Sequence, residues 1–490
     1  MLLLALLFVP VVTGLVAFLV RRDKYRRVLL LSTALLHSAM VMASWIAPPP
    51  PTLGGWLALD AIGRVFLSIT SLLFLAVAVY GLSYLRRERH ITHTDFEEGF
   101  LFADASEARF TGCLLLFLAA MTLVTISQHF GVLWVAIEAT TLASAPLIFF
   151  HRHHRSLEAT WKYLLICSVG IALALLGNFF LTIAAIQSDG SSLPLVVSSL
   201  VREATRLNDV WLKAAFVLLF VGYGTKMGLA PLHTWLPDAH SEAPSMISAL
   251  LSGALLNCAF LGILRMQQVC AAAGCAAFGQ DMLIGFGLLS MAIAAVFLQE
   301  QMDYKRLLAY SSVEHVGILA LGVGLGGSGA FGALLHAVNH SLTKAMLFLV
   351  AGNILASYQS KSTAEVRGVL RVLPVSGVLW VAGFLAITGS PPFGPFLSEF
   401  TILKAALDQG RSGVAITYLV LLAVIFVGMA TSMLTMAQGT LGKDRGRVIE
   451  AEPLLTVASP AVLGALVLLL GVYVPPLLRH ALQEAAQTLG

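Results

Sequence analysis

The stretch GYGTKMGLAPLHTWLPDAHSEAPS, residues 222–245, decides the fold of this chain. It continues an apolar run that begins near Trp211, which predicts a membrane helix. Lys226 falls near mid-span and Pro231 follows about one turn later. A lysine at the bilayer centre costs about 2.5–3.5 kcal/mol, and a proline breaks the backbone ladder. A broken, charged membrane helix is typical of an ion path. The alternative is a structural lysine beside a packing kink.

The composition is that of an all-α polytopic membrane protein. Of 490 residues, 58% are hydrophobic and 11% are charged, whereas soluble proteins have about 25% charged residues. Residues 1–20 have no preceding basic stretch and no clear cleavage site, so we expect a retained first helix. The net charge of +4 reflects membrane topology, and no nucleic-acid partner is expected.

Hydropathy predicts fourteen transmembrane spans, two of them broken by proline. They are expected at about 2–20, 28–46, 62–85, 111–127, 131–150, 160–186, 211–231, 244–266, 281–299, 305–325, 329–357, 372–388 continuing brokenly to 407, 414–437 and 454–474. The breaks fall at Pro231 in span 7 and at Pro391 and Pro392 in span 12. Span 12 comes five spans after span 7, and an odd offset inverts the orientation of a span in the membrane. We therefore predict two inverted five-helix repeats, spans 4–8 and 9–13. The predicted organisation is an N-terminal three-helix segment, a first half-channel repeat, a second half-channel repeat, and a terminal loop with a last helix, at 1–110, 111–267, 280–437 and 438–490.

The basic residues predict the orientation of the spans. Loops after odd-numbered spans hold 20 of the 30 lysines and arginines, and the opposite loops and tail hold six. Because basic loops stay in the cytoplasm, we expect the odd loops inside and both termini outside. In the loop between spans 8 and 9, which this orientation places outside, Cys270 and Cys275 form either a disulfide or two unpaired thiols, and the sequence favours unpaired thiols.

Two ionisable residues in the first repeat are expected to act together. Glu138 falls in the middle of span 5, and Lys226 is its predicted partner if spans 5 and 7 touch. Such a pair titrates, because separating the charges lowers the pKa of the lysine and raises that of the glutamate. The alternative is a static salt bridge. His233 and His240, after the break, lie in a predicted cytoplasm-side extension of span 7, as a proton inlet or as ordering contacts.

The second repeat carries a larger set of buried ionisable residues. His336, His340 and Lys344 in span 11 are spaced by four and predict one stripe along a helix. Two histidines at this spacing also resemble a metal pair, but the lysine would repel a cation, so we predict a proton relay and no metal. Span 10 contributes Glu314 and His315 near its cytoplasmic end, for proton transfer or as a helix-terminal pair. Two further candidates follow the break in span 12, the acid Glu399 and the base Lys404.

Several motifs of this chain resemble a known family. KMGLAPLHTWLPDAHSEAPS (226–245), the Glu138 span and HAVNHSLTKAMLFL (336–349) look like the antiporter-like subunits of respiratory complex I, Mrp antiporters and group 4 hydrogenases. The segments 134–181, 310–318 and 389–403 look closest to hydrogenase-4 component F. The similarity covers nearly all of spans 4–13. The chain ends soon after span 14, so we do not expect the complex I member with a long lateral helix.

The resemblance implies a fourteen-helix fold with two inverted repeats and roles for individual residues. Glu138 and Lys226 match the charged pair of the first half-channel, Lys344 matches the family's span 11 lysine, and Glu399 matches a span 12 acid. The chain departs from the family in span 8, where Asn257 stands at about the position of a linking lysine or histidine. Asparagine can order water but carries no charge.

These observations predict a proton-translocating membrane subunit of a bacterial redox complex of the hydrogenase-4 or formate-hydrogenlyase type. The chain has no iron–sulfur or dinucleotide motif, so we expect no cofactor in it and no enzyme activity by itself. The resemblance implies a Ni–Fe centre and iron–sulfur clusters in partner subunits of the inner membrane complex. Two alternatives are an Mrp-type sodium–proton antiporter subunit, which the few carboxylates disfavour, and a passive membrane anchor.

Overall fold

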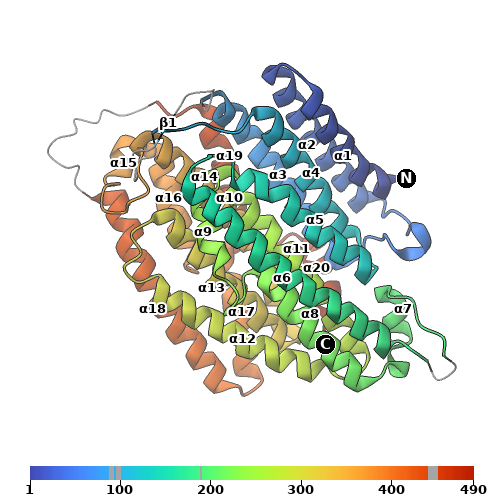
Figure 1. Cartoon of the computed structure of the whole chain (residues 1–490). Helices are drawn as coiled ribbons and strands as arrows, with labels where there is room; N and C mark the ends of the chain where they lie inside the picture. The colour runs from blue at the N-terminus through green and yellow to red at the C-terminus, as the bar shows by residue number, and fades with distance from the viewer. Residues whose placement is uncertain (88–92, 95–100, 188–189, 440–450) are drawn as a thin grey trace.

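The computed structural model describes residues 1–87, 93–94, 101–187, 190–439 and 451–490, and this part of the chain is almost entirely helical (Figure 1). The helices are α1 (Leu2–Leu19), α2 (Asp23–Ile46), η1 (Leu53–Gly55), α3 (Ala61–Arg87), α4 (Glu107–Ile126), α5 (Phe130–Ile148), α6 (His154–Ala184), α7 (Val197–Arg202), η2 (Ala204–Arg206), α8 (Asp209–Met227), α9 (Trp235–Glu242), α10 (Ser245–Leu250), η3 (Leu251–Leu255), α11 (Leu256–Ala272), α12 (Ala276–Phe297), α13 (Tyr304–Leu325), α14 (Gly327–Tyr358), α15 (Val369–Val372), α16 (Pro374–Ile387), α17 (Gly394–Asp408), α18 (Ser412–Gln438), α19 (Leu454–Val472) and α20 (Pro476–Gln487). Strands β1 (His93–Thr94) and β2 (Leu101–Phe102) form one short antiparallel ladder.

The predicted fourteen spans are confirmed among the described residues. Thirteen helical segments are long and apolar enough to cross a membrane. The remaining span is the broken one, formed by α16 and α17, each too short to cross alone. Part of the predicted basic-loop pattern, at Arg89 and residues 443–447, lies outside the described residues.

The segments predicted as two inverted repeats correspond to α4–α11 and α12–α18, and each contains one interrupted span. The first half-helix of each interrupted span is followed closely by a left-handed glycine, Gly228 at φ +84° after α8 and Gly389 at φ +64° after α16. Only glycine adopts this conformation at little cost, so the chain can turn out of the helix there. Proline follows each glycine and prevents the helix from continuing.

Small residues let neighbouring helices approach closely within each repeat. A Cβ atom added to Gly222 of α8 would lie 2.5 Å from the carbonyl oxygen of Gly170 on α6, and one added to Gly317 of α13 would lie 2.6 Å from that of Gly287 on α12. Close backbone approach through small residues is how membrane helices associate without a hydrophobic driving force. The α6–α8 contact brings the side chains of α6 against Lys226.

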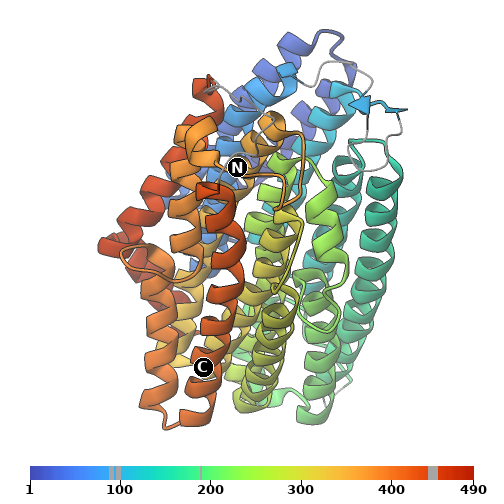
Figure 2. The ribbon, with the colours of Figure 1, turned by 90° about the vertical axis from the view of Figure 1, so that its left-hand side faces the viewer.

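Burial divides the bundle into a sealed centre and a lipid-exposed rim. The axes of most helices are roughly aligned with one another (Figure 2). α1 and α18 lie at opposite edges (Figure 1), and less than a third of their apolar windows is buried. The apolar windows of α10–α11 and of α13 are buried completely, and most of that of α14. Of the residues predicted from sequence, these sealed helices carry Asn257, Glu314, His315, His336, His340 and Lys344.

The last helix, α20, is the element that the span prediction missed. It is short and strongly amphipathic, so a window that searches for about 20 apolar residues passes over it. It packs against α3 and α14. The residues that follow it, 488–490, hydrogen-bond to α11 and to the backbone at the start of α14.

Candidate functional site

The first half of the candidate site is centred on Lys226, in the last turn of α8. Its side chain is fully buried. The ammonium group donates hydrogen bonds to Thr141 Oγ1 at 2.7 Å and to Tyr163 Oη at 2.5 Å. It also lies 4.4 Å from the ring centroid of Tyr163, within range of a cation–π interaction. A buried ammonium needs such partners, since losing its water costs several kcal/mol.

Thr141 lies between the two charges that we expected to act as a pair. Glu138 on α5 accepts a hydrogen bond from Thr141 Oγ1 at 3.2 Å and a longer one from Ser168 Oγ at 3.4 Å. No ion pair joins Glu138 to Lys226 among the described contacts, because the threonine hydroxyl bridges them. Glu138 is half-buried and Ser168 is exposed, so this end of the bridge reaches the surface of the chain.

The helix break beside Lys226 is closed by specific hydrogen bonds. Trp235 Nε1 donates to the carbonyl oxygen of Thr225 at 2.9 Å. Ala230 N donates to Ser290 Oγ on α12 at 2.9 Å, which ties the break to the second half. The Trp235 ring packs 5.0 Å from that of Tyr163. The backbone groups freed by Pro231 are thus satisfied by protein and not by lipid, as membrane burial requires.

Asn257 lies between the halves, as its predicted position requires. It follows the π-helical turn η3, and its Nδ2 donates to Ser341 Oγ on α14 at 2.8 Å and to the carbonyl oxygen of Gly253 at 2.9 Å. The thiol of Cys258, the next residue, lies within electrostatic reach of Lys226. A π-bulge in a membrane helix is frequently found at a functional position. α11 therefore places Cys258 near Lys226 of the first half and Asn257 against Ser341 of the second half.

The second half contains a cluster of histidines from two helices. His315 Nδ1 and His336 Nε2 share a hydrogen bond of 2.8 Å, and His336 Nδ1 is 2.9 Å from Ser398 Oγ on α17. The His315 ring lies 5.0 Å from those of both His336 and His340. The predicted stripe on α14 is present, and His315 of α13 packs against it to form the cluster.

Lys344 and two acids complete the second half. Lys344 is fully buried and donates to the carbonyl oxygen of Leu308 at 2.7 Å. Glu314 is buried and lies within electrostatic reach of both Lys344 and Glu399. Our placement of Glu314 and His315 near the cytoplasmic end of their span is wrong. Both lie in the middle of α13, since that helix begins ten residues earlier than Glu314.

The histidine cluster also has the composition of a metal site. One ligand atom from each of His315, His336 and Glu399 lies within 4.8 Å of the other two. Two histidines and a carboxylate are a zinc ligand set. However, the direct hydrogen bond between His315 Nδ1 and His336 Nε2 occupies one nitrogen of each ring.

The remaining predicted residues are distributed unevenly. Lys404 has a side chain 63% exposed and pairs with Asp408 one turn later, so it points away from the buried cluster. His240 is buried, donates from Nδ1 to the carbonyl oxygen of Leu236 at 2.9 Å, and lies within electrostatic reach of Lys344. His233 is also buried, with its ring 6.4 Å from that of Tyr310.

Sequence reasoning missed the residues that connect the charged ones. The hydroxyl groups of Thr141, Tyr163, Ser341 and Ser398 stand in apolar spans, where short polar side chains are common and give no signal. Lys305 was counted as a basic loop residue, but its side chain is buried. The signal available was its position, at the start of a span and two residues after Asp303.

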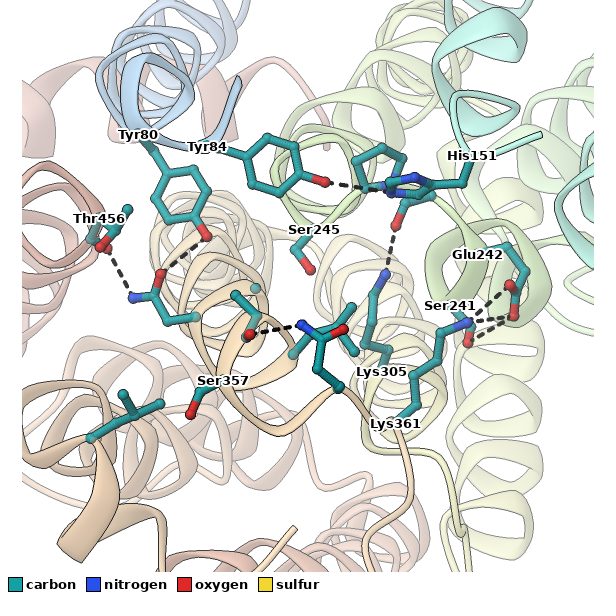
Figure 3. A pocket seen from close by; sticks show the side chains of 18 of the residues that line it. Tyr80, Tyr84, His151, Ser241, Glu242, Ser245, Lys305, Ser357, Lys361 and Thr456 are labelled. Atoms are coloured by element: carbon teal, nitrogen blue, oxygen red, sulfur yellow. Dashed lines mark hydrogen bonds and ion pairs between the residues drawn. The ribbon is translucent and has the colours of Figure 1, made fainter. Parts of the chain in front are cut away.

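A pocket of about 410 Å³ has polar and charged side chains in its wall, among them His151, Lys305 and Lys361 (Figure 3). At its wall, Lys361 Nζ is 2.9 Å from Glu242 Oε1. Burial alone would raise the pKa of Glu242, but the charge and hydrogen bond of Lys361 lower it to about 2. Lys305 enters the pocket and donates to the carbonyl oxygen of Ala243 at 2.5 Å. One turn along α13 is Leu308, whose carbonyl oxygen binds Lys344.

The fold and the buried site define a class of protein, the antiporter-like membrane subunits. Residues 127–429 match the family model described as NADH:quinone oxidoreductase/Mrp antiporter, and the chain belongs to this family. It is 36% identical over 434 residues to a hydrogenase-4 component F homolog of Methylacidiphilum infernorum (isolate V4), covering 87% of each chain. It is 27% identical to hydrogenase-4 component B of Escherichia coli (strain K12), over 77% of this chain and about half of that protein (54%).

Solved structures share the fold of the whole chain. A chain of an archaeal membrane-bound sulfane sulfur reductase superposes with a TM-score of 0.85 at 20% identity, covering 99% of this chain and 97% of that one. A chain of the Mrp complex from Dietzia sp. DQ12-45-1b gives 0.82 at 19% identity, with coverage of 99% and 97%. At these identities the likeness concerns the fold.

Proposed function

We propose that this chain translocates protons as a membrane subunit of a redox-driven complex of the hydrogenase-4 or formate-hydrogenlyase type. The observation that carries the proposal is the set of buried ionisable side chains that runs from α5 to α17. Each would cost several kcal/mol in a purely structural role. Intramembrane ionisable groups that face one another across helices are typical of proton relays. The similarity to hydrogenase-4 components supports the choice of complex.

The chain supplies the proton path, and its partners supply the energy. Moving one charge across 100 mV takes about 2.3 kcal/mol, and the sequence has no redox motif to provide it. We therefore assign the Ni–Fe centre and iron–sulfur clusters to partner subunits, and no enzyme activity to this chain alone. The complex is proposed to lie in a bacterial inner membrane, with both termini of this chain outside.

The first step acts on the bridge between Glu138 and Lys226. Glu138 reaches the surface of the chain, so a charge change in a neighbouring subunit can act on it directly. Loss of the Glu138 charge weakens the Thr141 bridge and removes a favourable charge near Lys226, which lowers the affinity of the lysine for its proton. The proton then passes toward α11, where Asn257 and Ser341 orient water but carry no charge.

The second half takes up and ejects the proton. Uptake runs from the polar pocket past Lys305, because Lys305 is one turn from the carbonyl oxygen that binds Lys344. The proton then moves through the histidine cluster, where one hydrogen bond already links two rings. Glu399 is the proposed exit group, since its buried Oε1 has no protein partner among the described residues and can receive a proton.

The test is proton pumping by the complete complex, purified with this chain and reconstituted in liposomes. Lys226→Ala and Glu138→Gln should each lower the number of protons moved per electron, while Lys404→Gln, at an exposed position, serves as the matched control. Unchanged pumping in both buried variants would refute the assignment. Pumping that depends on sodium in the wild type would instead identify the sodium–proton antiporter alternative.

A further inference from the structure

The loop between α11 and α12 brings two cysteines together through a defined helix cap. Gly274 has a left-handed φ of +78°. Its N–H donates to the carbonyl oxygen of Ala271 at 3.2 Å, and the N–H of Cys275 donates to that of Cys270 at 2.9 Å. These two bonds form a Schellman motif, in which the side chains at the positions of Cys270 and Cys275 contact each other.

The side chains of both cysteines are shielded from solvent. Cys270 is fully buried and Cys275 is 7% exposed. The neighbouring Cys270 side chain lowers the pKa of the Cys275 thiol. A thiol with a lowered pKa forms the thiolate, which is the attacking species in disulfide exchange. The helix cap fixes the backbone at both residues and places their side chains on the same side of the turn.

We propose that Cys270 and Cys275 form an intramolecular disulfide. The Cys275 thiolate attacks a disulfide of a thiol–disulfide donor in the outer compartment and releases one donor thiol. The Cys270 thiol then loses its proton, attacks the mixed disulfide and releases the second donor thiol. The chain loses two electrons and two protons, and the donor gains both. The inference rests on the proposed orientation, which places this loop on the oxidising side of the membrane.

The position of the disulfide indicates what it stabilises. The end of α11 is where the residues after α20 attach. Gln268 Nε2 donates to Thr488 Oγ1 at 2.8 Å, and Gln267 Nε2 to the carbonyl oxygen of Leu489 at 3.3 Å. At the start of α14, Gly327 N donates to the carbonyl oxygen of Gly490. A cross-link over the cap would hold the glutamines in place and so slow detachment of α20 from α3 and α14.

The direct test needs no substitution. The native complex is denatured in N-ethylmaleimide without reductant, and its peptides are mapped before and after reduction. We expect Cys270 and Cys275 to be unmodified and linked before reduction, and both to react after it, whereas Cys113 reacts at once. Alkylation of both thiols without reduction would overturn the proposal.

The orientation is tested separately, so the two failures can be told apart. Arg411→Cys introduces a thiol at a position whose native side chain is 39% exposed, in a loop proposed to lie on the same side as the cysteine pair. A membrane-impermeant maleimide added to intact cells should label it. Labelling together with two free native thiols overturns the disulfide alone. Labelling only in inverted membranes overturns the orientation, and the disulfide with it.

The proposed effect of the disulfide on the attachment of α20 is tested separately. The measured quantity is the rate of trypsin cleavage at Arg479 in α20. We expect reductant to accelerate this cleavage several-fold in the wild type, and Cys275→Ser to do so without reductant. Cys113→Ser is the matched control and should behave as the wild type. The double variant Cys270→Ser/Cys275→Ser should no longer respond to reductant. Cleavage of the wild type that is unchanged by reductant would refute the role.

Discussion

The two halves of the chain solve the same problem, a lysine buried in a broken-helix repeat, with different chemistry. In the first half a hydroxyl bridge joins Lys226 to Glu138, and the acid reaches the surface of the chain. In the second half Lys344 binds a backbone carbonyl, and its neighbours are histidines sealed inside the bundle. Lys226 is thus connected to the surface of the chain through Glu138, whereas Lys344 lies beside the buried histidine cluster.

This difference assigns a direction of control. A charged group at the surface of the chain can interact with charges of a neighbouring subunit, because that subunit can reach it. Solvent screens this interaction less there than in bulk water. A sealed histidine cluster has no such neighbour and responds only to the chain's own charges, such as Glu314. We therefore infer that the first half receives the signal and that the second half carries out the transfer across the membrane.

The largest effect is expected from Lys344→Ala in the second half. The substitution removes the charged group next to the histidine cluster and leaves no side chain to replace it. Transfer of a proton by a positioned side chain contributes about 10²–10⁴ in rate, so proton pumping should fall at least about 100-fold. The measurement is the initial rate of acidification in liposomes that contain the complex. Pumping within twofold of the wild type would show that the sealed half is not the transfer path.

The next largest effect is expected from Thr141→Val, which preserves shape but removes the bridge. A hydrogen bond to a charged group is worth about 1.5–3 kcal/mol, which corresponds to a factor of about ten or more. Pumping per electron should fall by about that factor, while electron transfer in the partner subunits continues. Thr140→Val, whose hydroxyl binds only its own helix backbone, is the matched control. Equal behaviour of the two variants would contradict the bridge.

The sequence was sufficient for the fold and for the charged residues, for physical reasons. The features that define the fold can be recognised in the sequence without a structure. They are apolar runs of span length, two proline breaks and a bias of basic residues toward alternate loops. A charge in such a run is costly wherever it falls, so Lys226 and Lys344 were visible at once. The hydroxyl bridge through Thr141 could not be predicted, because the position of Thr141 relative to Lys226 depends on how α5 and α8 pack. His315 joined the cluster for the same reason, since α13 and α14 meet only in three dimensions.

A third test asks whether the pocket at the mouth of the second half is held by Glu242 and Lys361. Removing one partner of a buried ion pair costs about 3–5 kcal/mol, so Lys361→Met should lower the apparent melting temperature in detergent. The pKa of Glu242 is lowered to about 2 from a usual value of about 4.5. Its stabilisation is therefore complete above pH 4.5 and is lost as the pH falls toward 2. The difference between wild type and Glu242→Gln should shrink as the pH falls below 4. A difference that is as large at pH 2 as at pH 5 would mean that another group holds the pocket.

The smallest effect is expected from Ser168→Ala, and it sharpens the comparison most. The Ser168 hydroxyl is 3.4 Å from Glu138 Oε1, at the long end of hydrogen-bond geometry, and it is exposed. Exposed contacts of this kind are worth about 0–1 kcal/mol, so pumping should change by less than about fivefold. If Glu138 is the group that senses a neighbouring subunit, the residue beside it on the surface should matter more for assembly than for transfer. The measurement is pumping together with the fraction of this chain that copurifies with its partners. A loss of pumping as large as that of Thr141→Val, with assembly intact, would place the transfer path at the surface of the first half and reverse the assignment of the two halves.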